Sequence, residues 1–142
     1  MQAAMDQAYR FLAQRFLSSY ELTQKMRRKQ IEDPIIERVL ERLRDYDYIN
    51  DERLSEQVLN YLMKEQKYGA YMIKQKMKLR GLTVPPEISD YDEVKAAYRV
   101  VEKEFGSILN EDFTPRVKVF NFLKYRGFST STIQVVCNDF YE

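Results

Sequence analysis

The residues of this chain that are most suited to chemistry are carboxylates that lie close together. Asp45 with Asp47, and Asp51 with Glu52, form acidic pairs of the type that acid-base catalysis uses. The sequence contains no histidine, so the commonest general base and the commonest metal ligand are both missing. Acids at helix starts are explained by capping and by the helix dipole. We therefore expect no catalytic residues and no enzyme.

Cofactor, metal and disulfide sites are not predicted either. The four glycines, at positions 69, 81, 106 and 127, are isolated at predicted helix ends and form no phosphate-binding loop. Metal-ligand spacing is absent, so we expect no cofactor and no metal. The single cysteine, Cys137, excludes an internal disulfide and lies in an apolar helical pattern that predicts a small core residue.

Basic side chains offer a second kind of function, which is binding. The net charge is only +1, but residues 60–82 hold six cations and one acid, Glu65. Acids collect instead from Glu32 to Glu56 and from Glu87 to Asp112. The candidate binding residues are Lys25, Arg28, Lys64, Lys67, Lys74, Lys76, Lys78, Arg80, Lys124 and Arg126.

Such cations can neutralise phosphates, or can meet the acidic surface of a protein. Tyr68, Tyr71 and Tyr125 lie among them and are suited to stacking on bases. The alternative is that the lysines solvate exposed helix faces and the tyrosines fill gaps between units. Both interpretations stay open at this point.

Helices must position these side chains. With 44% hydrophobic and 32% charged residues, few Gly and Pro and little strand-like alternation, the sequence predicts an all-α fold. A first helix is expected from Gln2 to Leu17, and the stripe of Leu54, Val58, Tyr61 and Leu62 predicts another after Asn50. Thr83 to Ser89, with Pro85 and Pro86, predicts a turn or a short helix. Further helix starts are predicted at Ser18 with Glu21, Asp33 with Pro34, Asp90 with Glu93, Thr114 with Pro115, and Ser129.

The helices repeat one plan. Placing Lys29-Gln30-Ile31 over Arg80-Gly81-Leu82 and Arg126-Gly127-Phe128 aligns Leu22 with Ile73 and Val119, and Met26 with Met77 and Leu123. The offsets are 51 residues (80 minus 29) and 46 residues (126 minus 80). We predict three tandem three-helix repeats, helix-turn-helix-like, over 1–49, 50–89 and 90–142. Stacked units would form an elongated curved array with a basic stripe opposite an acidic one.

The middle block has a family resemblance. Tyr48-Ile49-Asn50-Asp51-Glu52-Arg53-Leu54-Ser55, leading into Lys67-Tyr68-Gly69 and then Ile73 to Leu82, closely resembles the RecX family of recombination regulators. Ser19-Tyr20-Glu21-Leu22, Lys25-Met26 and Phe120 to Phe128 agree as well. The resemblance covers nearly the whole chain. It departs from the family at Gln30, where glycine is usual, and at Pro85-Pro86.

The resemblance implies an all-helical regulator of homologous recombination, DNA repair and the SOS response, without a catalytic site of its own. It implies binding to the recombinase RecA and to the RecA-DNA filament, and inhibition of RecA ATPase, strand-exchange and coprotease activity. Direct contact with single- or double-stranded DNA is also expected. The ten basic residues above are candidates for contacts with either partner.

Two other classes of function remain. The helices could serve a sequence-specific DNA-binding protein of helix-turn-helix type, or a generic helical scaffold for another protein.

No apolar run approaches the roughly 20 residues of a membrane span, and no signal peptide is recognised at the first residues. We therefore expect a cytoplasmic monomer with no membrane partner.

Overall fold

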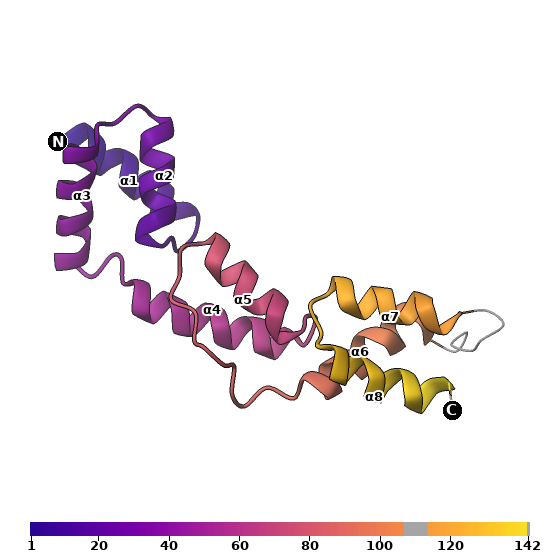
Figure 1. Cartoon of the computed structure of the whole chain (residues 1–142). Coiled ribbons are helices and arrows are strands. Elements are labelled where there is room, and N and C mark those ends of the chain that lie inside the picture. Colours follow the sequence, from indigo (N-terminus) through magenta and orange to yellow (C-terminus); the bar gives the residue numbers. More distant parts are fainter. Residues whose placement is uncertain (107–113, 142) are drawn as a thin grey trace. The chain divides into compact units, whose positions relative to one another are not determined.

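The computed structural model describes residues 1–106 and 114–141, and in these ranges every regular element is a helix. The prediction of an all-α fold is therefore confirmed (Figure 1). In chain order the helices are α1 (Gln2–Gln14), α2 (Ser19–Arg28), α3 (Asp33–Asp45), α4 (Asp51–Glu65), α5 (Ala70–Leu79), α6 (Glu93–Phe105), α7 (Arg116–Tyr125) and α8 (Thr130–Tyr141).

Contacts divide the chain into two compact units. Unit 1 comprises residues 1–58 and 77–84, and unit 2 comprises residues 59–76 and 85–142. The division falls within α4 and α5, so the middle block contributes to both units. Each unit is described separately below.

Unit 1 is built on α1, α2 and α3. Its core includes Ala8, Leu22, Met26, Val39 and Leu43, which are all fully buried. The predicted capping box is present, because Ser18 Oγ accepts from the Glu21 N–H and the Glu21 carboxylate accepts from the Ser18 N–H. Helix α1 ends at Gln14, three residues before the predicted Leu17, because the chain turns extended at Arg15.

Unit 2 is built on α6, α7 and α8. The apolar faces of these helices meet at Ala97, Val101, Val119, Leu123 and Ile133, which are fully buried. Cys137, only 1% exposed, belongs to the same core, as predicted, and burial raises the pKa of its thiol.

The segment between α5 and α6 settles one of the open alternatives. Residues 80–92 contain no helix, so the middle block has two helices, and the third helix predicted within 50–89 does not form. Val84 and Pro85 each precede a proline and are therefore disfavoured from helical backbone angles, and neither proline has an N–H to donate. The segment is held by the Ser55 hydroxyl, which accepts from the Thr83 N–H at 3.0 Å in unit 1.

The repeat alignment is confirmed at the level of backbone geometry. The aligned turn residues Gln30, Gly81 and Gly127 all have left-handed φ, at 62°, 69° and 87°. The N–H of the next residue donates to the carbonyl five residues back in each copy, from Ile31 to Met26, Leu82 to Met77 and Phe128 to Leu123. This is the Schellman arrangement that ends helices. The aligned apolar positions of α2, α5 and α7 are all 0% exposed.

Several predicted details change. Asn50 and Ser129 cap α4 and α8 as predicted. Asp92, not Asp90, caps α6, and the N-cap of α3 is Glu32, not Asp33. Helix α7 begins at Arg116 with Pro115 as its N-cap, one residue after the predicted start at Thr114 and Pro115. Tyr61, predicted in the apolar stripe of α4, is 63% exposed.

Two glycines of unit 2 let two turns meet. The Gly69 N–H, before α5, donates to the Arg126 carbonyl at 3.0 Å. A Cβ atom on Gly69 would lie 2.2 Å from the carbonyl oxygen of Gly127, in the turn between α7 and α8. Only glycine permits such a close approach of two backbones.

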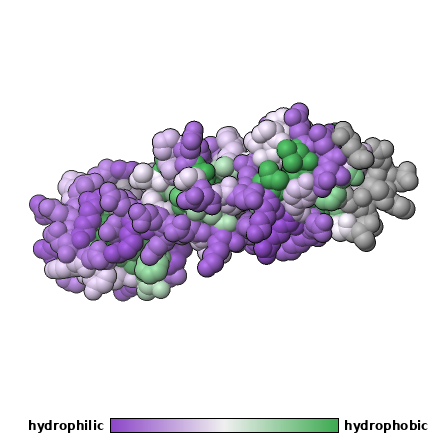
Figure 2. Space-filling model, turned by 90° about the horizontal axis from the view of Figure 1, so that it is seen from below, coloured by the Kyte–Doolittle hydropathy of each residue, from purple (hydrophilic) through white to green (hydrophobic). Residues whose placement is uncertain are grey.

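One face of the molecule is largely polar (Figure 2). Figure 2 shows a mainly hydrophilic face with apolar residues in small separate groups. No helix in residues 1–106 and 114–141 has the length and apolar character needed to cross a membrane.

Candidate functional site

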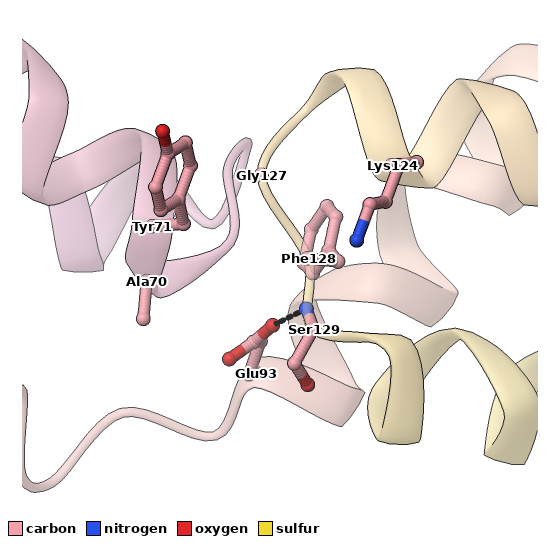
Figure 3. A pocket seen from close by; sticks show the side chains of 7 residues that line it. All are labelled: Ala70, Tyr71, Glu93, Lys124, Gly127, Phe128 and Ser129. Carbon is pink, nitrogen blue, oxygen red and sulfur yellow. Dashed lines mark hydrogen bonds between the residues drawn. The ribbon is translucent and has the colours of Figure 1, made fainter.

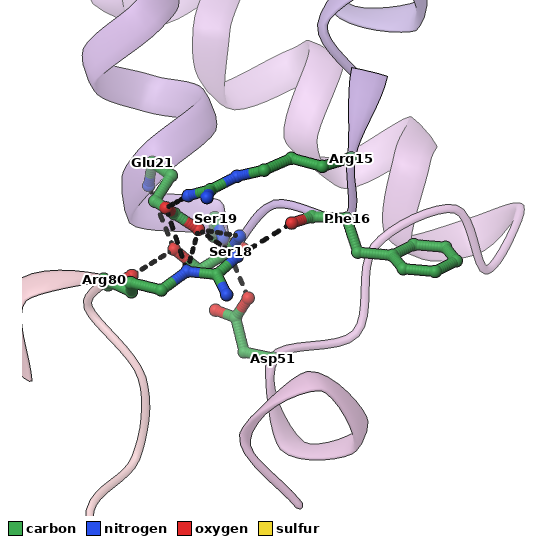
Figure 4. Close-up of polar contacts among 7 residues, drawn as sticks. All are labelled: Arg15, Phe16, Ser18, Ser19, Glu21, Asp51 and Arg80. Carbon is green, nitrogen blue, oxygen red and sulfur yellow. Dashed lines mark hydrogen bonds and ion pairs between the residues drawn. The ribbon is translucent and has the colours of Figure 1, made fainter. Parts of the chain in front are cut away.

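Arg80 is the predicted binding residue that the structure ties most firmly into its own unit. Its Nε and Nη2 atoms donate to the Glu21 carboxylate at 3.0 to 3.2 Å, and Nη2 also donates to the Phe16 carbonyl at 2.8 Å (Figure 4). The Ser18 hydroxyl in turn donates to the Arg80 carbonyl. Arg80 therefore joins the turn after α5 to the start of α2, and its charge is neutralised within unit 1.

The acidic pair Asp51 and Glu52 also has a structural explanation. An Asp51 carboxylate oxygen accepts from the Ser19 N–H at 2.8 Å, so it satisfies a free amide at the start of α2 (Figure 4). Asp47 pairs with Arg53 at 2.9 Å. No group of three or more Asp, Glu, Cys or His side chains that could hold a metal ion occurs in the described ranges.

Two other predicted cations of unit 1 line a pocket beside α2. The pocket has a volume of about 360 Å³, and Lys25 and Arg28 line it together with Arg15, Tyr20 and Leu79. The Lys25 ammonium lies 5.6 Å from the centroid of the Phe11 ring. Arg28 and Lys78 are exposed. These three cations are placed where a partner of the protein can reach them.

In unit 2, two of the predicted binding lysines contact other residues of the same unit. The Lys74 ammonium donates to the Pro86 carbonyl, and the Lys76 ammonium lies 4.5 Å from the centroid of the Tyr68 ring. The Tyr91 hydroxyl also donates to the Tyr68 carbonyl, and burial, with the nearby Glu93 charge, raises the pKa of Tyr91 to about 12. Lys74 therefore helps to hold the segment before α6, whereas Lys76 lies against a residue before α5. Lys64 is exposed, and Lys67 pairs with Glu65 at 3.1 Å.

Lys124 lines a pocket of about 560 Å³ between the start of α5 and the α7-α8 turn (Figure 3). Tyr71 and Phe128 contribute rings to the lining. The Glu93 carboxylate accepts from the Ser129 N–H at 2.6 Å and so fixes the turn before α8. The exposed Lys124 ammonium is 3.4 Å from the Thr130 hydroxyl.

Arg126 closes the α7 end of a separate groove in unit 2. Its Nη1 atom donates to the Lys67 carbonyl at 3.3 Å, and its guanidinium lies 4.8 Å from the Phe122 ring centroid. Arg99 and Lys103 of α6 line the same groove. The sequence did not predict these two residues because they fall in the acidic stretch from Glu87 to Asp112. Residues 107–112 of that stretch lie outside the described residues. The spacing of four residues between Arg99 and Lys103, which puts them on one helix face, was the available signal.

The alignment of the repeats identifies a set of equivalent surface residues that the distribution of charge did not identify. On each of α2, α5 and α7, three residues at positions i, i+4 and i+7 lie on one side of the helix. The first has an aromatic or apolar side chain, the second has a side-chain amide, and the third is a cation. We call these three sets of residues the middle-helix faces. They are Tyr20-Gln24-Arg27, Tyr71-Gln75-Lys78 and Val117-Asn121-Lys124. Tyr20, Tyr71 and Val117 are 50%, 66% and 64% exposed.

The cations at the ends of the three faces differ in availability. Arg27 pairs with Asp33 at 3.0 Å, whereas Lys78 has no ion-pair partner among the residues that the structure describes. Within residues 1–106 and 114–141, Lys124 has no ion-pair partner and makes the long contact with Thr130 noted above. Of the predicted residues, Lys78 and Lys124 thus combine exposure, an available charge and equivalent repeat positions. The predicted single stripe through all ten residues stays a prediction.

Comparison with known proteins gives the family. Residues 4–43 match the model of the first three-helix domain of RecX, and residues 90–137 match that of the third. The chain is 30% identical over 129 residues to the regulatory protein RecX of Acinetobacter baylyi, which covers 89% of this chain and 80% of that protein. The RecX protein of Chlorobium phaeobacteroides is 29% identical over 134 residues, or 92% and 89% of the two chains.

Solved structures agree on the fold. The crystal structure of RecX from Lactobacillus salivarius superposes with a TM-score of 0.75 at 20% identity, covering 98% of this chain and 95% of that one. A second crystal structure of a regulatory protein RecX gives a TM-score of 0.75 at 18% identity. With two domain models matched in order and relatives aligned over most of the chain, this protein belongs to the RecX family of regulatory proteins.

Proposed function

We propose that this protein regulates homologous recombination by binding RecA and the RecA-DNA filament, and that it inhibits the ATPase, strand-exchange and coprotease activities of RecA. Membership of a regulatory protein family supports the proposal. The observation that carries it in this chain is the presence of equivalent exposed faces on α2, α5 and α7.

Equivalent faces suit a partner whose own surface repeats. Successive protomers of a filament present the same surface again and again, so one chain with several similar faces can contact more than one protomer. Linked contacts bind more tightly than any one of them because the second becomes intramolecular. Lys78 and Lys124 would pair with acidic groups, and Tyr20 and Tyr71 would supply the large rings that are enriched in protein interfaces.

Inhibition needs no chemistry on the part of the regulator. A protein that binds one state of the filament more tightly than another shifts the filament toward the favoured state. If that state hydrolyses ATP slowly or cannot extend, ATPase and strand exchange fall together. This mechanism fits a chain in which two of the candidate carboxylates, Asp51 and Asp47, are engaged in helix capping and in an ion pair.

The test is the rate of ATP hydrolysis by RecA from the same organism on single-stranded DNA, measured while this protein is titrated in. We expect the rate to fall. Loss at substoichiometric amounts would indicate capping or disassembly of the filament, whereas loss only near saturation would indicate coating of the filament. Unchanged hydrolysis at saturating protein would contradict the proposed inhibition.

A mobility-shift assay separates the proposal from the other classes. A strong preference for one duplex sequence at moderate salt would instead indicate a DNA-binding protein of helix-turn-helix type. Binding to neither RecA nor DNA would leave a scaffold for another protein.

A further inference from the structure

The groove between the α4-α5 turn, α6 and the end of α7 in unit 2 has a volume of about 440 Å³ and an unusual lining. Four cations line it, Lys67, Arg99, Lys103 and Arg126, against two carboxylates, Glu65 and Glu104. Four minus two leaves a net charge of +2 around the groove. Glu65 is already paired with Lys67 at 3.1 Å, so it does not neutralise the other three cations.

The two guanidinium groups are held in place by neutral acceptors. Arg126 donates to the Lys67 carbonyl at 3.3 Å and lies against the Phe122 ring, and Arg99 Nη1 donates to the Gln66 side-chain oxygen at 3.2 Å. A guanidinium has five N–H donors, so each retains donors after these contacts. Neither is paired with a carboxylate in the part of the chain that the structure describes.

This arrangement matches the chemistry of phosphate recognition. Fixed guanidinium groups bind phosphate oxygens through two parallel hydrogen bonds, and lysines at the rim add attraction that depends on salt. Arg99 and Lys103 are exposed, so an anion can reach them from solvent. We propose that the groove formed by Lys67, Arg99, Lys103 and Arg126 is a phosphate-binding site of unit 2.

The site goes beyond the proposed function because it binds its ligand without any protein partner. Its phosphate groups would come from a polynucleotide backbone or from a free nucleoside triphosphate. Failure of the site would leave RecA regulation through the middle-helix faces untouched, since none of the four cations belongs to those faces.

The experiment uses the full chain without RecA and two probes. Fluorescence anisotropy follows a fluorescein-labelled oligothymidylate, and calorimetry follows ATP alone. The site variant is Arg99→Gln with Lys103→Gln, and the matched control is Arg10→Gln with Arg38→Gln, two exposed arginines of unit 1. Circular dichroism checks that both variants keep the helical content of the wild type.

With the oligonucleotide, the wild type should bind more tightly as salt falls. The logarithm of the association constant falls linearly with the logarithm of the salt concentration, and loss of two phosphate contacts makes this slope less steep by about 1.4. If the lines of the wild type and the site variant meet near ~1 M salt, the site variant binds on the order of 25-fold more weakly at roughly 0.1 M salt. The control should retain most of the wild-type affinity and slope. If free nucleotides bind in the groove, calorimetry should show that the wild type binds ATP and that the site variant does not.

Loss of either ligand in the site variant, with retention in the control, supports the site and identifies the source of the phosphate. Equal losses in site variant and control would overturn it, because the binding would then follow net charge alone. Binding of neither probe by the wild type would also overturn it.

Discussion

At the scale of single residues, Glu21 shows how one carboxylate holds several parts of unit 1. Burial of its carboxyl group raises the pKa. Hydrogen bonds from Arg80 and from the Ser18 N–H, together with the charges of Arg80 and Arg15, lower the pKa by more than burial raises it, so the pKa of Glu21 lies below its ordinary value. Since the pKa is lower in the folded state, ionised Glu21 stabilises the fold.

The Glu21→Gln variant tests this pH dependence. The stabilisation is complete above the ordinary pKa of about 4.3 and is lost as pH falls through the lower folded-state value. We expect the variant to lose about 2 kcal/mol of unfolding free energy at neutral pH, and the difference to shrink below about pH 4. Urea unfolding at a series of pH values measures it.

The exposed Glu41, for which the described residues offer no ion-pair partner, is the control. Glu41→Gln should change the unfolding free energy little at any pH. A Glu21→Gln deficit that stays constant from neutral pH to below pH 4 would show that the charge of Glu21 is not the source of the stability.

At the scale of elements, the turns after α2, α5 and α7 have the same geometry but not the same residue. Gln30 adopts φ of 62° where Gly81 and Gly127 stand in the other copies. A residue with a side chain is strained in this region, whereas glycine is not.

Replacing Gln30 with glycine should therefore stabilise unit 1. We expect a gain of about 1 kcal/mol, seen as a higher midpoint of thermal unfolding. Lys29→Gly is the control, because Lys29 has a φ of −85° and glycine there only adds freedom to the unfolded chain. A Gln30→Gly protein that is no more stable than the wild type would mean that the turn carries no strain.

The contact between Gly69 and Gly127 is a second property of the turns. We expect Gly69→Ala to cost about 2 kcal/mol or more, because the methyl group would collide with backbone atoms that cannot move aside. Gly106→Ala is the comparison, since its Cβ would meet nothing within 4 Å and only its backbone angles, φ 56° and ψ −136°, cost energy, about 1 to 3 kcal/mol.

Chemical unfolding of the two alanine variants decides between the two causes. A greater loss in Gly69→Ala supports the steric contact between the turns. A Gly69→Ala protein that is as stable as the wild type would mean that the turns separate freely in solution.

The elements differ in how far the sequence could predict them. Helices and repeat register follow from local apolar spacing and turn residues, so Leu22, Ile73 and Val119 were aligned correctly. The start of α6 was not, because Asp90 and Asp92 are both suitable caps and only the folded chain selects Asp92. The internal role of Arg80 depends on Glu21, 59 residues earlier, and no local pattern reports such a contact. Arg99 and Lys103 were missed because charge was summed along the chain instead of over the folded surface.

At the scale of the whole molecule, the proposed function requires that equivalent positions serve one partner. Lys78 and Lys124 stand at the same repeat position, on α5 and α7, and both are exposed. If these faces bind a repeating surface, reversing both charges should weaken binding much more than reversing two exposed charges elsewhere. Arg38 on α3 and Lys95 on α6 are exposed cations outside the middle-helix faces and provide that comparison.

The most direct measurement is the affinity of the protein for RecA assembled on single-stranded DNA, determined by biolayer interferometry for the wild type and the two double variants. Lys78→Glu with Lys124→Glu, and Arg38→Glu with Lys95→Glu, change the net charge equally. The first pair should weaken binding at least about tenfold, or about 1.4 kcal/mol, while the second should have a small effect. Equal affinities of the two double variants, or a wild type that does not bind the filament, would contradict the proposed function.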